Sequence, residues 1–148
     1  AAVASVAIVG VAAVKAPQSS RALGIALGAR IGPDDTVVMV DEYYYDIPFY
    51  ARLSRPVLIA SRWDDPDVPR RDNWRKEIYD AARFDPALGA RLMVPLDHVE
   101  ALGCGAGATW FVVSPARAAR FEAMPEATRI ETDRRAQLWR LPPRACLG

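Results

Sequence analysis

The densest group of chemically active side chains in this sequence is the run 41–46, DEYYYD. Carboxylates accept hydrogen bonds, and each phenol ring combines apolar surface with a polar hydroxyl. Side chains of this kind suit contacts with a small polar ligand. The candidate binding residues are Asp41, Glu42, Tyr43, Tyr45, Asp46 and, four positions further on, Tyr50.

The position of this run supports a ligand site, although packing explains it as well. It follows the apolar segment 36–41, whose continuous hydrophobicity predicts a central strand covered on both faces. Open α/β sheets bind ligands at the carboxyl ends of such strands. The alternative is a partly buried corner in which the tyrosines pack their rings and keep their hydroxyls wet.

Other chemical patterns in the sequence are weak. His98, the one histidine, has no nucleophile pattern near it and is expected to be a surface residue. The acidic run WDDPD at 63–67 lacks an EF-hand pattern and is expected to be a solvated loop. The glycine-rich run at 103–107 follows a predicted helix and precedes a strand, the reverse of a phosphate-binding loop. No catalytic residue, metal site or cofactor is therefore predicted.

Composition indicates one folded domain. The chain has 148 residues, about half of them apolar, which is enough for a hydrophobic core. With 19 basic and 18 acidic residues the net charge is +1, which gives no reason to expect nucleic acid or an acidic membrane as a partner. Cys104 and Cys146 form no metal motif; they are either unrelated thiols or a disulfide formed in an oxidising compartment.

The elements that must position the run 41–46 follow from apolar periodicity. Leu23, Leu27 and Ile31 predict a helix that Ser19 or Ser20 caps, and Asp46 is expected to cap a second helix. The remaining predicted elements are strands at 57–60 and 110–114, helices at 46–53, 73–84, 95–102 and 115–124, a short strand or extended link at 91–94, and an antiparallel hairpin at 128–132 and 137–141. This order predicts a three-layer α/β domain with a mainly parallel sheet and an antiparallel edge hairpin.

Three parts of the chain are distinguished. Residues 1–16 are apolar until Lys15 and are consistent with either the end of a transmembrane helix or a buried apolar segment of the domain. Residues 17–143 are the predicted soluble α/β domain, and residues 144–148 form a tail. A stand-alone module that binds a small ligand near Asp41 and Glu42 accounts for these features without any membrane part.

Several segments resemble a known family. They are DIPFYARLSRPVLIA at 46–60, WFVVSPARAARFEA at 110–123 and AQLWRLP at 136–142. They resemble the carboxyl-terminal soluble domain of bacterial membrane glycosyltransferases of the dolichyl-phosphate-mannose protein mannosyltransferase class, and most nearly the aminoarabinose transferases of lipid A. The element FY-x-x-x-x-RPV of that resemblance is Phe49, Tyr50, Arg55, Pro56 and Val57.

The resemblance implies a periplasmic domain of an inner-membrane enzyme that takes a sugar from a polyprenyl phosphate and transfers it to a lipid or protein acceptor. The expected partners are the transmembrane part of the same chain and the lipid-linked sugar or glycan acceptor. The family's catalytic carboxylate lies in the membrane part, so no catalytic residue is carried over here. Tyr43, Tyr45, Asp46 and Tyr50 become candidate contacts with that membrane part or with a glycan, and a periplasmic location permits a disulfide between Cys104 and Cys146.

Overall fold

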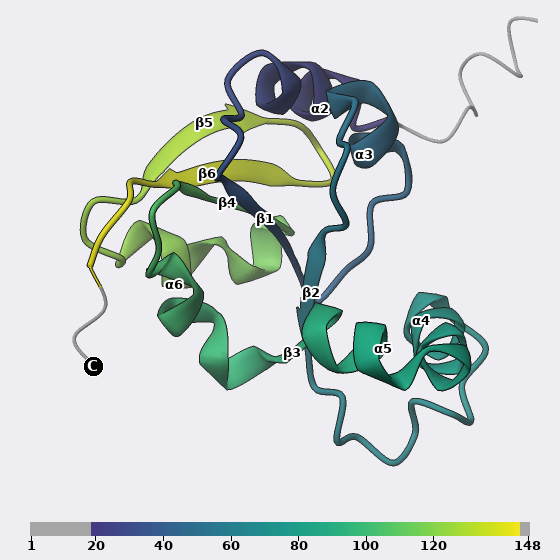
Figure 1. Cartoon of the computed structure of the whole chain (residues 1–148). Coiled ribbons are helices and arrows are strands. Elements are labelled where there is room, and N and C mark those ends of the chain that lie inside the picture. The colour runs from purple at the N-terminus through teal and green to yellow at the C-terminus, as the bar shows by residue number, and fades with distance from the viewer. Residues whose placement is uncertain (1–18, 146–148) are drawn as a thin grey trace, which may run out of the picture.

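A six-stranded mixed sheet forms the centre of the domain (Figure 1). The computed structural model describes residues 19–145. The strands, in the spatial order β3-β2-β1-β4-β6-β5, are β1 Thr36–Val40, β2 Leu58–Ser61, β3 Met93–Pro95, β4 Thr109–Val113, β5 Thr128–Thr132 and β6 Gln137–Leu141. Strands β1 to β4 run parallel, whereas β6 is antiparallel to both β4 and β5. The predicted α/β fold, with its parallel sheet and antiparallel edge hairpin, is confirmed.

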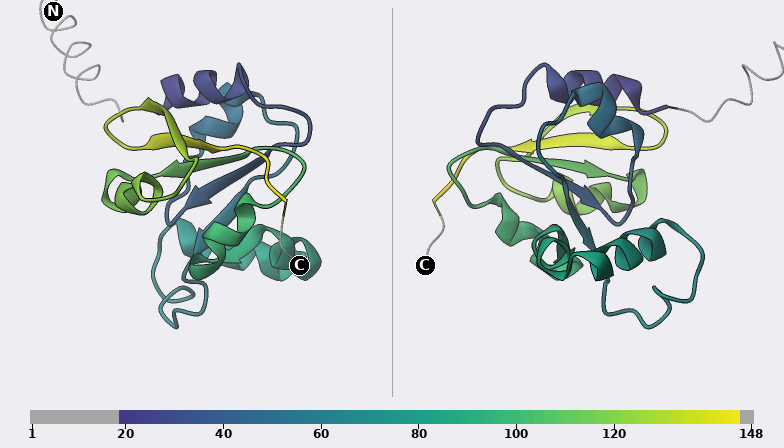
Figure 2. Two further views of the ribbon diagram at one scale, coloured as in Figure 1. Left: turned by 90° about the vertical axis from the view of Figure 1, so that its left-hand side faces the viewer. Right: turned by 45° about the vertical axis from the view of Figure 1, so that its right-hand side comes forward.

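Helices cover both faces of this sheet, which gives three layers (Figure 2). They are α2 Arg21–Gly28, α3 Asp46–Ala51, α4 Trp74–Phe84, α5 Pro86–Leu92, α6 Ala118–Glu122 and the 3-10 segments η1 Leu96–Gly103 and η2 Pro115–Arg117. Helices α2 and α3 lie over one face of the sheet, and η1 and α6 lie over the other. Helices α4 and α5 lie beside the end of the sheet formed by β2 and β3 (Figure 1).

Strand β1 shows why a continuous apolar run was the right signal for a central strand. Val37 and Met39 contribute to the hydrophobic cluster beneath α2 and α3. Val38 and Val40 contribute to the opposite cluster, which also contains Phe121 of α6. Because successive side chains of a strand point to opposite faces, burial on both faces requires apolar residues at every position.

Two local predictions differ from the structure. The helix predicted at 73–84 ends before Asp85 and Pro86 as expected, but the short helix α5 that follows was not predicted. In α5 the Asp85 carboxylate accepts a hydrogen bond from the Leu88 amide at 2.9 Å. Proline is favoured in the first turn of a helix, so the same dipeptide both ends α4 and begins α5. The segment expected as a helix at 95–102 is the 3-10 segment η1, in which Val99 is the buried apolar side chain.

The apolar segment 1–16 lies outside the described residues, so both of its interpretations stay open. No helix within residues 19–145 has the length and apolar character that crossing a bilayer requires.

Candidate functional site

Asp41 lies at the carboxyl ends of the central strands, where the sequence predicted a ligand site. It follows β1 directly and has a left-handed backbone with φ 54°. Its carboxylate accepts a hydrogen bond from the Ser61 hydroxyl, at the end of β2, at 2.9 Å. The same carboxylate is paired with the guanidinium of Arg117, from η2 after β4. Asp41 therefore connects the loops that follow three adjacent strands.

Arg117 and Ser61 are the site residues that sequence reasoning missed. Each one follows an apolar run that was correctly predicted to be a strand. The carboxyl ends of neighbouring parallel strands meet at one edge of the sheet. Polar residues that follow the predicted strands, such as Ser61 and Arg117, could therefore have been expected near Asp41. The arginine is about half exposed and the carboxylate is 21% exposed, so water still reaches the pair.

The three tyrosines that follow have different surroundings. Tyr44 is buried, and its hydroxyl donates to the Arg135 carbonyl at 3.2 Å while the Arg135 guanidinium lies 5.5 Å above its ring. Burial of the phenol, together with the nearby charge of Glu42, raises the pKa of Tyr44 well above its ordinary value. Tyr43 and Tyr45 meet edge to face, with ring centroids 4.7 Å apart.

Tyr45 links this corner to α4. Its ring is 57% exposed, yet its hydroxyl donates to the Glu77 carboxylate. Partial burial and this hydrogen bond raise the pKa of Tyr45 to about 12. Burial alone raises the pKa of the Tyr43 phenol. Both phenols are therefore neutral at physiological pH, and that of Tyr45 donates a hydrogen bond.

Asp46 does not cap its own helix, as the sequence had suggested. The residue at the N-cap of α3 is Tyr45, and the Asp46 carboxylate turns instead to the start of α2. There it accepts hydrogen bonds from the Ser20 amide at 2.7 Å and the Ser19 hydroxyl at 2.9 Å. A carboxylate is favoured at this place because the amino end of a helix carries partial positive charge and unpaired amides.

Asp46, and not Ser19 or Ser20, provides the side-chain cap of α2. Ser20 occupies the N-cap of α2, but its hydroxyl makes no capping bond. That oxygen is buried, and it has no hydrogen-bond partner among residues 19–145. The start of α2 is thus closed by a side chain 26 residues away in the sequence.

Tyr50 belongs to the contact between α2 and α3. A Cβ atom placed on Gly24 would lie 2.6 Å from the Cβ of Tyr50, so the two helices meet where α2 has no side chain. The guanidinium of Arg21 lies 5.7 Å above the Tyr50 ring, and the Phe49 ring is 5.3 Å away. Tyr50 is therefore separated from Asp41 by the packing of its helix.

The six predicted binding residues consequently do not line one cavity. Asp41 faces Ser61 and Arg117, Tyr45 faces α4, and Asp46 and Tyr50 face α2. Glu42 is half-buried on the same loop. Their role in binding stays a prediction, and their contacts show that most of them also hold elements of the domain together.

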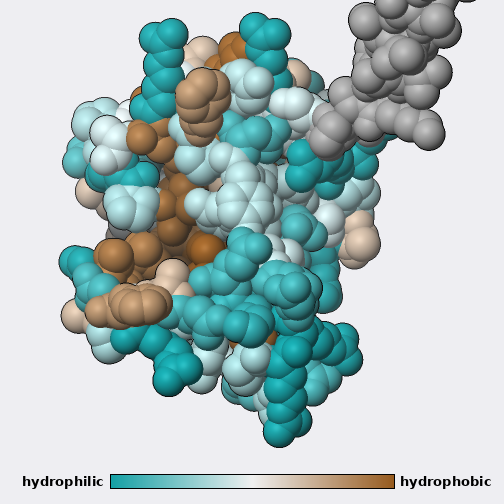
Figure 3. All heavy atoms as spheres, turned by 90° about the vertical axis from the view of Figure 1, so that its right-hand side faces the viewer, coloured by the Kyte–Doolittle hydropathy of each residue, from teal (hydrophilic) through white to brown (hydrophobic). Residues whose placement is uncertain are grey.

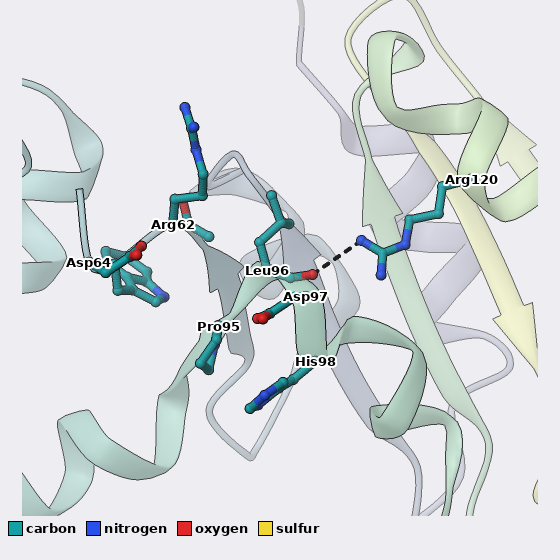
Figure 4. A pocket seen from close by; sticks show the side chains of 9 residues that line it. Arg62, Asp64, Pro95, Leu96, Asp97, His98 and Arg120 are labelled. Carbon is teal, nitrogen blue, oxygen red and sulfur yellow. Dashed lines mark hydrogen bonds between the residues drawn. The ribbon is translucent and has the colours of Figure 1, made fainter.

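A separate hollow of about 610 Å³ lies at the carboxyl ends of β2 and β3 (Figure 4). It is lined by Ser61, Arg62, Trp63, Asp64, Pro95, Leu96, Asp97, His98 and Arg120. The Arg120 guanidinium donates to the Leu96 carbonyl at 3.2 Å and to the Glu100 carboxylate at 3.1 Å. In Figure 4 the Arg62 side chain extends away from Asp97 and His98, so the charged groups of this hollow do not converge on one point.

An apolar groove of about 210 Å³ separates α4 and α5 from the sheet. Its lining includes Tyr43, Val57, Ile59, Leu88 and Leu92. Figure 3 shows apolar side chains gathered in a hollow on this side of the molecule. None of the described residues of α4 is fully buried, although Trp74 and Ile78 pack against the core.

Two further predicted features remain untested. Among residues 19–145, no group of three or more histidine, cysteine, aspartate or glutamate side chains is arranged to hold a metal ion. Cys104 is half-buried, while Cys146 lies outside the described residues. The Gly105 amide donates to the Arg144 carbonyl at 3.1 Å, which brings the tail beside the Cys104 loop. The disulfide stays a prediction.

The fold defines a small α/β domain, and solved structures contain a similar one. No known family model and no curated protein matches the sequence. The structure does match "ArnT from Cupriavidus metallidurans bound to Undecaprenyl phosphate", with 14% sequence identity and a TM-score of 0.57. The match to the same protein in the apo state has 14% identity and a TM-score of 0.56.

The two matches cover most of this chain but a small part of ArnT. Each covers 81% of this chain and 19% of ArnT, so the chain spans about a fifth of the length of the structures it matches. At this identity the likeness shows a shared fold.

Proposed function

We propose that this chain is the extracytoplasmic domain of an inner-membrane glycosyltransferase that takes its sugar from a polyprenyl phosphate and transfers it to a lipid or protein acceptor. The observation that carries the proposal is the fold match to one part of ArnT, a protein whose structure holds undecaprenyl phosphate. The sequence resemblance to the aminoarabinose transferases was found from other evidence, the motifs at 46–60 and 110–123, and leads to the same class.

In this proposal the domain covers the membrane part of the enzyme and supplies none of the reacting groups. The loop 41–46 and helix α3 present the surfaces that meet the membrane part or a glycan. Tyr45 and Glu42 are the best placed of the candidates, since Tyr45 is the most exposed of them and Glu42 has no hydrogen bond or ion pair within residues 19–145. Residues 1–16 would be the end of the last membrane helix.

The gene that encodes the chain provides the first test. We expect about a dozen apolar segments of roughly 20 residues upstream of Ala1, each long enough to span a bilayer. An open reading frame that starts near Ala1 would overturn the proposal.

Activity provides the second test. The full-length protein, in membranes, is expected to transfer sugar from a polyprenyl-phosphate donor to a lipid acceptor, whereas the 148-residue chain alone is expected to transfer none. Substitution of Tyr45 by Ala in the full-length enzyme is expected to reduce transfer. The control is Phe84→Ala, which removes a 93% exposed ring from the end of α4. Equal activity of both variants and the parent enzyme would remove Tyr45 from the site.

A stand-alone module for small ligands is the second candidate function. The hollow of about 610 Å³ at the carboxyl ends of β2 and β3 favours it, because α/β sheets bind ligands at that edge. Saturable binding of a small polar ligand by the 148-residue chain, with shifts confined to residues near Ser61 and Leu96 in NMR spectra, would support this candidate.

A further inference from the structure

The outer surface of α2 and α3 carries an excess of positive charge, although Asp34 and Asp35 follow in the turn between α2 and β1. Residues 19–33 and 47–58 contain four arginines, Arg21, Arg30, Arg52 and Arg55, and no aspartate or glutamate. All four are exposed, and none forms an ion pair with a carboxylate among residues 19–145. We call this surface the arginine face.

Contacts within the structure bring these four residues to one part of the molecule. Arg21 lies above the Tyr50 ring, which ties the start of α2 to α3. At the other end of the two helices, Gly28 meets the backbone of Ala51, the neighbour of Arg52. Arg30 follows two residues after Gly28 and donates to the Ala26 carbonyl at 2.9 Å.

Arg55 extends the same surface. It donates to the Asp35 carbonyl at 2.8 Å, in the turn that follows α2. The one acidic residue of the two helices, Asp46, accepts hydrogen bonds from Ser19 and Ser20 and forms an ion pair with Arg135 at 3.9 Å. Because carbonyl oxygens carry no net charge, the four guanidinium groups keep their positive charge available to a partner.

Apolar side chains are exposed among these arginines. Ile25 of α2 is 50% exposed and Phe49 of α3 is 76% exposed. The upper edge of Figure 3 shows strongly hydrophilic side chains projecting on either side of apolar ones. Arginine with exposed aromatic and aliphatic side chains is the composition of surfaces that lie in a membrane interface.

The surface formed by residues 62–91 supplies a contrast. Residues 62–91 contain seven basic residues, Arg62, Arg70, Arg71, Arg75, Lys76, Arg83 and Arg91. They also contain seven acidic residues, Asp64, Asp65, Asp67, Asp72, Glu77, Asp80 and Asp85. Salt bridges join Arg71 to Asp67, Arg75 to Asp65, and Lys76 to Asp80. That surface is close to neutral, whereas residues 19–33 and 47–58 carry four basic residues and no acidic one.

We propose that the arginine face binds the surface of a bilayer that contains anionic lipids. The four guanidinium groups would lie among the lipid phosphates, and Ile25 and Phe49 would enter the boundary between headgroups and acyl chains. A basic residue near an anionic bilayer strengthens binding by about fivefold, so four of them contribute on the order of several hundredfold. This inference does not require the chain to take part in sugar transfer.

The test compares two variants of the 148-residue chain that differ in place but not in charge. The first replaces Arg21, Arg30, Arg52 and Arg55 by Gln, and the control replaces Arg62, Arg70, Arg83 and Arg91 by Gln. Both retain residues 1–18, so any membrane affinity of that segment is the same in both. Binding is measured by sedimentation with vesicles of phosphatidylglycerol and phosphatidylcholine, and circular dichroism confirms that both variants fold.

We expect the first variant to bind at least 100-fold more weakly than the parent chain, and the control to bind nearly as well as the parent. Binding of the parent is expected to fall steeply as salt rises, and to be weak on vesicles of phosphatidylcholine alone. Equal losses in the two variants would overturn the proposal. Binding of inorganic phosphate at the same arginines without vesicle binding would also overturn it, because it would indicate a soluble anion as the ligand.

A second measurement tests the orientation. A tryptophan placed at Phe49 is expected to shift its fluorescence to shorter wavelength on anionic vesicles and to be quenched by brominated acyl chains. The matched control places tryptophan at Phe84, which is 93% exposed beside the neutral surface and is expected to remain unquenched. Quenching at Phe84 in place of Phe49 would show that another face meets the bilayer. Loss of sugar transfer in the full-length enzyme has no bearing on either result.

Discussion

Asp35 is expected to make a large contribution to the stability of the domain, and its replacement by Ala tests this expectation. The Asp35 side chain accepts hydrogen bonds from the Gly32 amide at 2.9 Å, the Ala108 amide at 2.8 Å and the Trp110 indole at 2.7 Å. These bonds join the turn after α2 and the entry to β1 with the entry to β4. Asp35→Ala removes all three acceptor contacts at once.

The magnitude follows from the burial of the donors. Trp110 is 0% exposed and Ala108 is 1% exposed, so water cannot readily replace the carboxylate at either N–H group. A buried donor left without a partner costs about 1–3 kcal/mol, and two such donors cost roughly 2–6 kcal/mol. We therefore expect Asp35→Ala to lower the free energy of unfolding by about 4 kcal/mol, a large part of the 5–15 kcal/mol typical of a domain.

The stabilisation by Asp35 is expected to decrease as the pH is lowered. Burial by itself raises the pKa of Asp35, but the hydrogen bonds from Trp110, Gly32 and Ala108 and the charge of Arg140 outweigh it, so the pKa is lowered. Folding thus favours the ionised carboxylate. Its contribution is fully present above the unfolded-state pKa, near 4, and is lost as the pH falls through the lower folded-state pKa.

Urea unfolding followed by tryptophan fluorescence measures both effects. The control is Asp34→Ala, which removes the exposed neighbouring carboxylate and is expected to change stability by less than about 0.5 kcal/mol. The difference in free energy of unfolding between the parent and Asp35→Asn is expected to become smaller as the pH is lowered below about 4. A loss of less than 1 kcal/mol in Asp35→Ala, or an equal loss in Asp34→Ala, would refute the reasoning.

Two other predictions concern the helices around the tyrosine loop. Gly24→Ala places a Cβ 2.6 Å from the Cβ of Tyr50 and is expected to destabilise the chain by about 1–3 kcal/mol in urea unfolding. At Gly105 a new Cβ meets nothing within 4 Å, so a stability loss in Gly105→Ala as large as in Gly24→Ala would contradict this account. Glu77→Ala is expected to lower the pKa of Tyr45 from about 12, because the variant removes a hydrogen-bond acceptor and a negative charge. NMR of labelled tyrosine rings reports that pKa, and an unchanged value would show that the Tyr45–Glu77 bond does not form.

The strands and helix α2 were predictable because their burial repeats along the sequence, as at Leu23 and Leu27 of α2. In β4 all five residues of TWFVV are buried, and in β6 the buried positions include Leu138, Trp139 and Leu141. Helix α5 had no such signal, because its one fully buried residue is Gly89. A built Cβ at Gly89 would lie 2.5 Å from the Cβ of Ala82 in α4, a constraint that only the folded chain reveals.

The contacts of the candidate site were much less predictable than its position. The sequence correctly suggested that Asp41 lies after a central strand, because that depends on local pattern. Its partners Ser61 and Arg117 are 20 and 76 residues away, so they depend on the order of strands in the sheet. The predicted role of Asp46 was wrong for the same reason. Its carboxylate lies at the start of α3 but accepts a hydrogen bond from the Ser20 amide at the start of α2.

Net charge alone does not describe how a chain meets a charged surface, because electrostatic attraction there is local. In physiological salt the screening length is about 8 Å, so a bilayer responds to the charges that face it and not to the sum over the molecule. The total of +1 combines the neutral surface of residues 62–91, the arginine face and other residues in which acidic groups outnumber basic ones. At the carboxyl edge the Arg117 charge is already met by Asp41, whereas on α2 and α3 no described carboxylate meets Arg21 or Arg52. The proposal for the arginine face therefore rests on unpaired charge and not on the position of the strand ends.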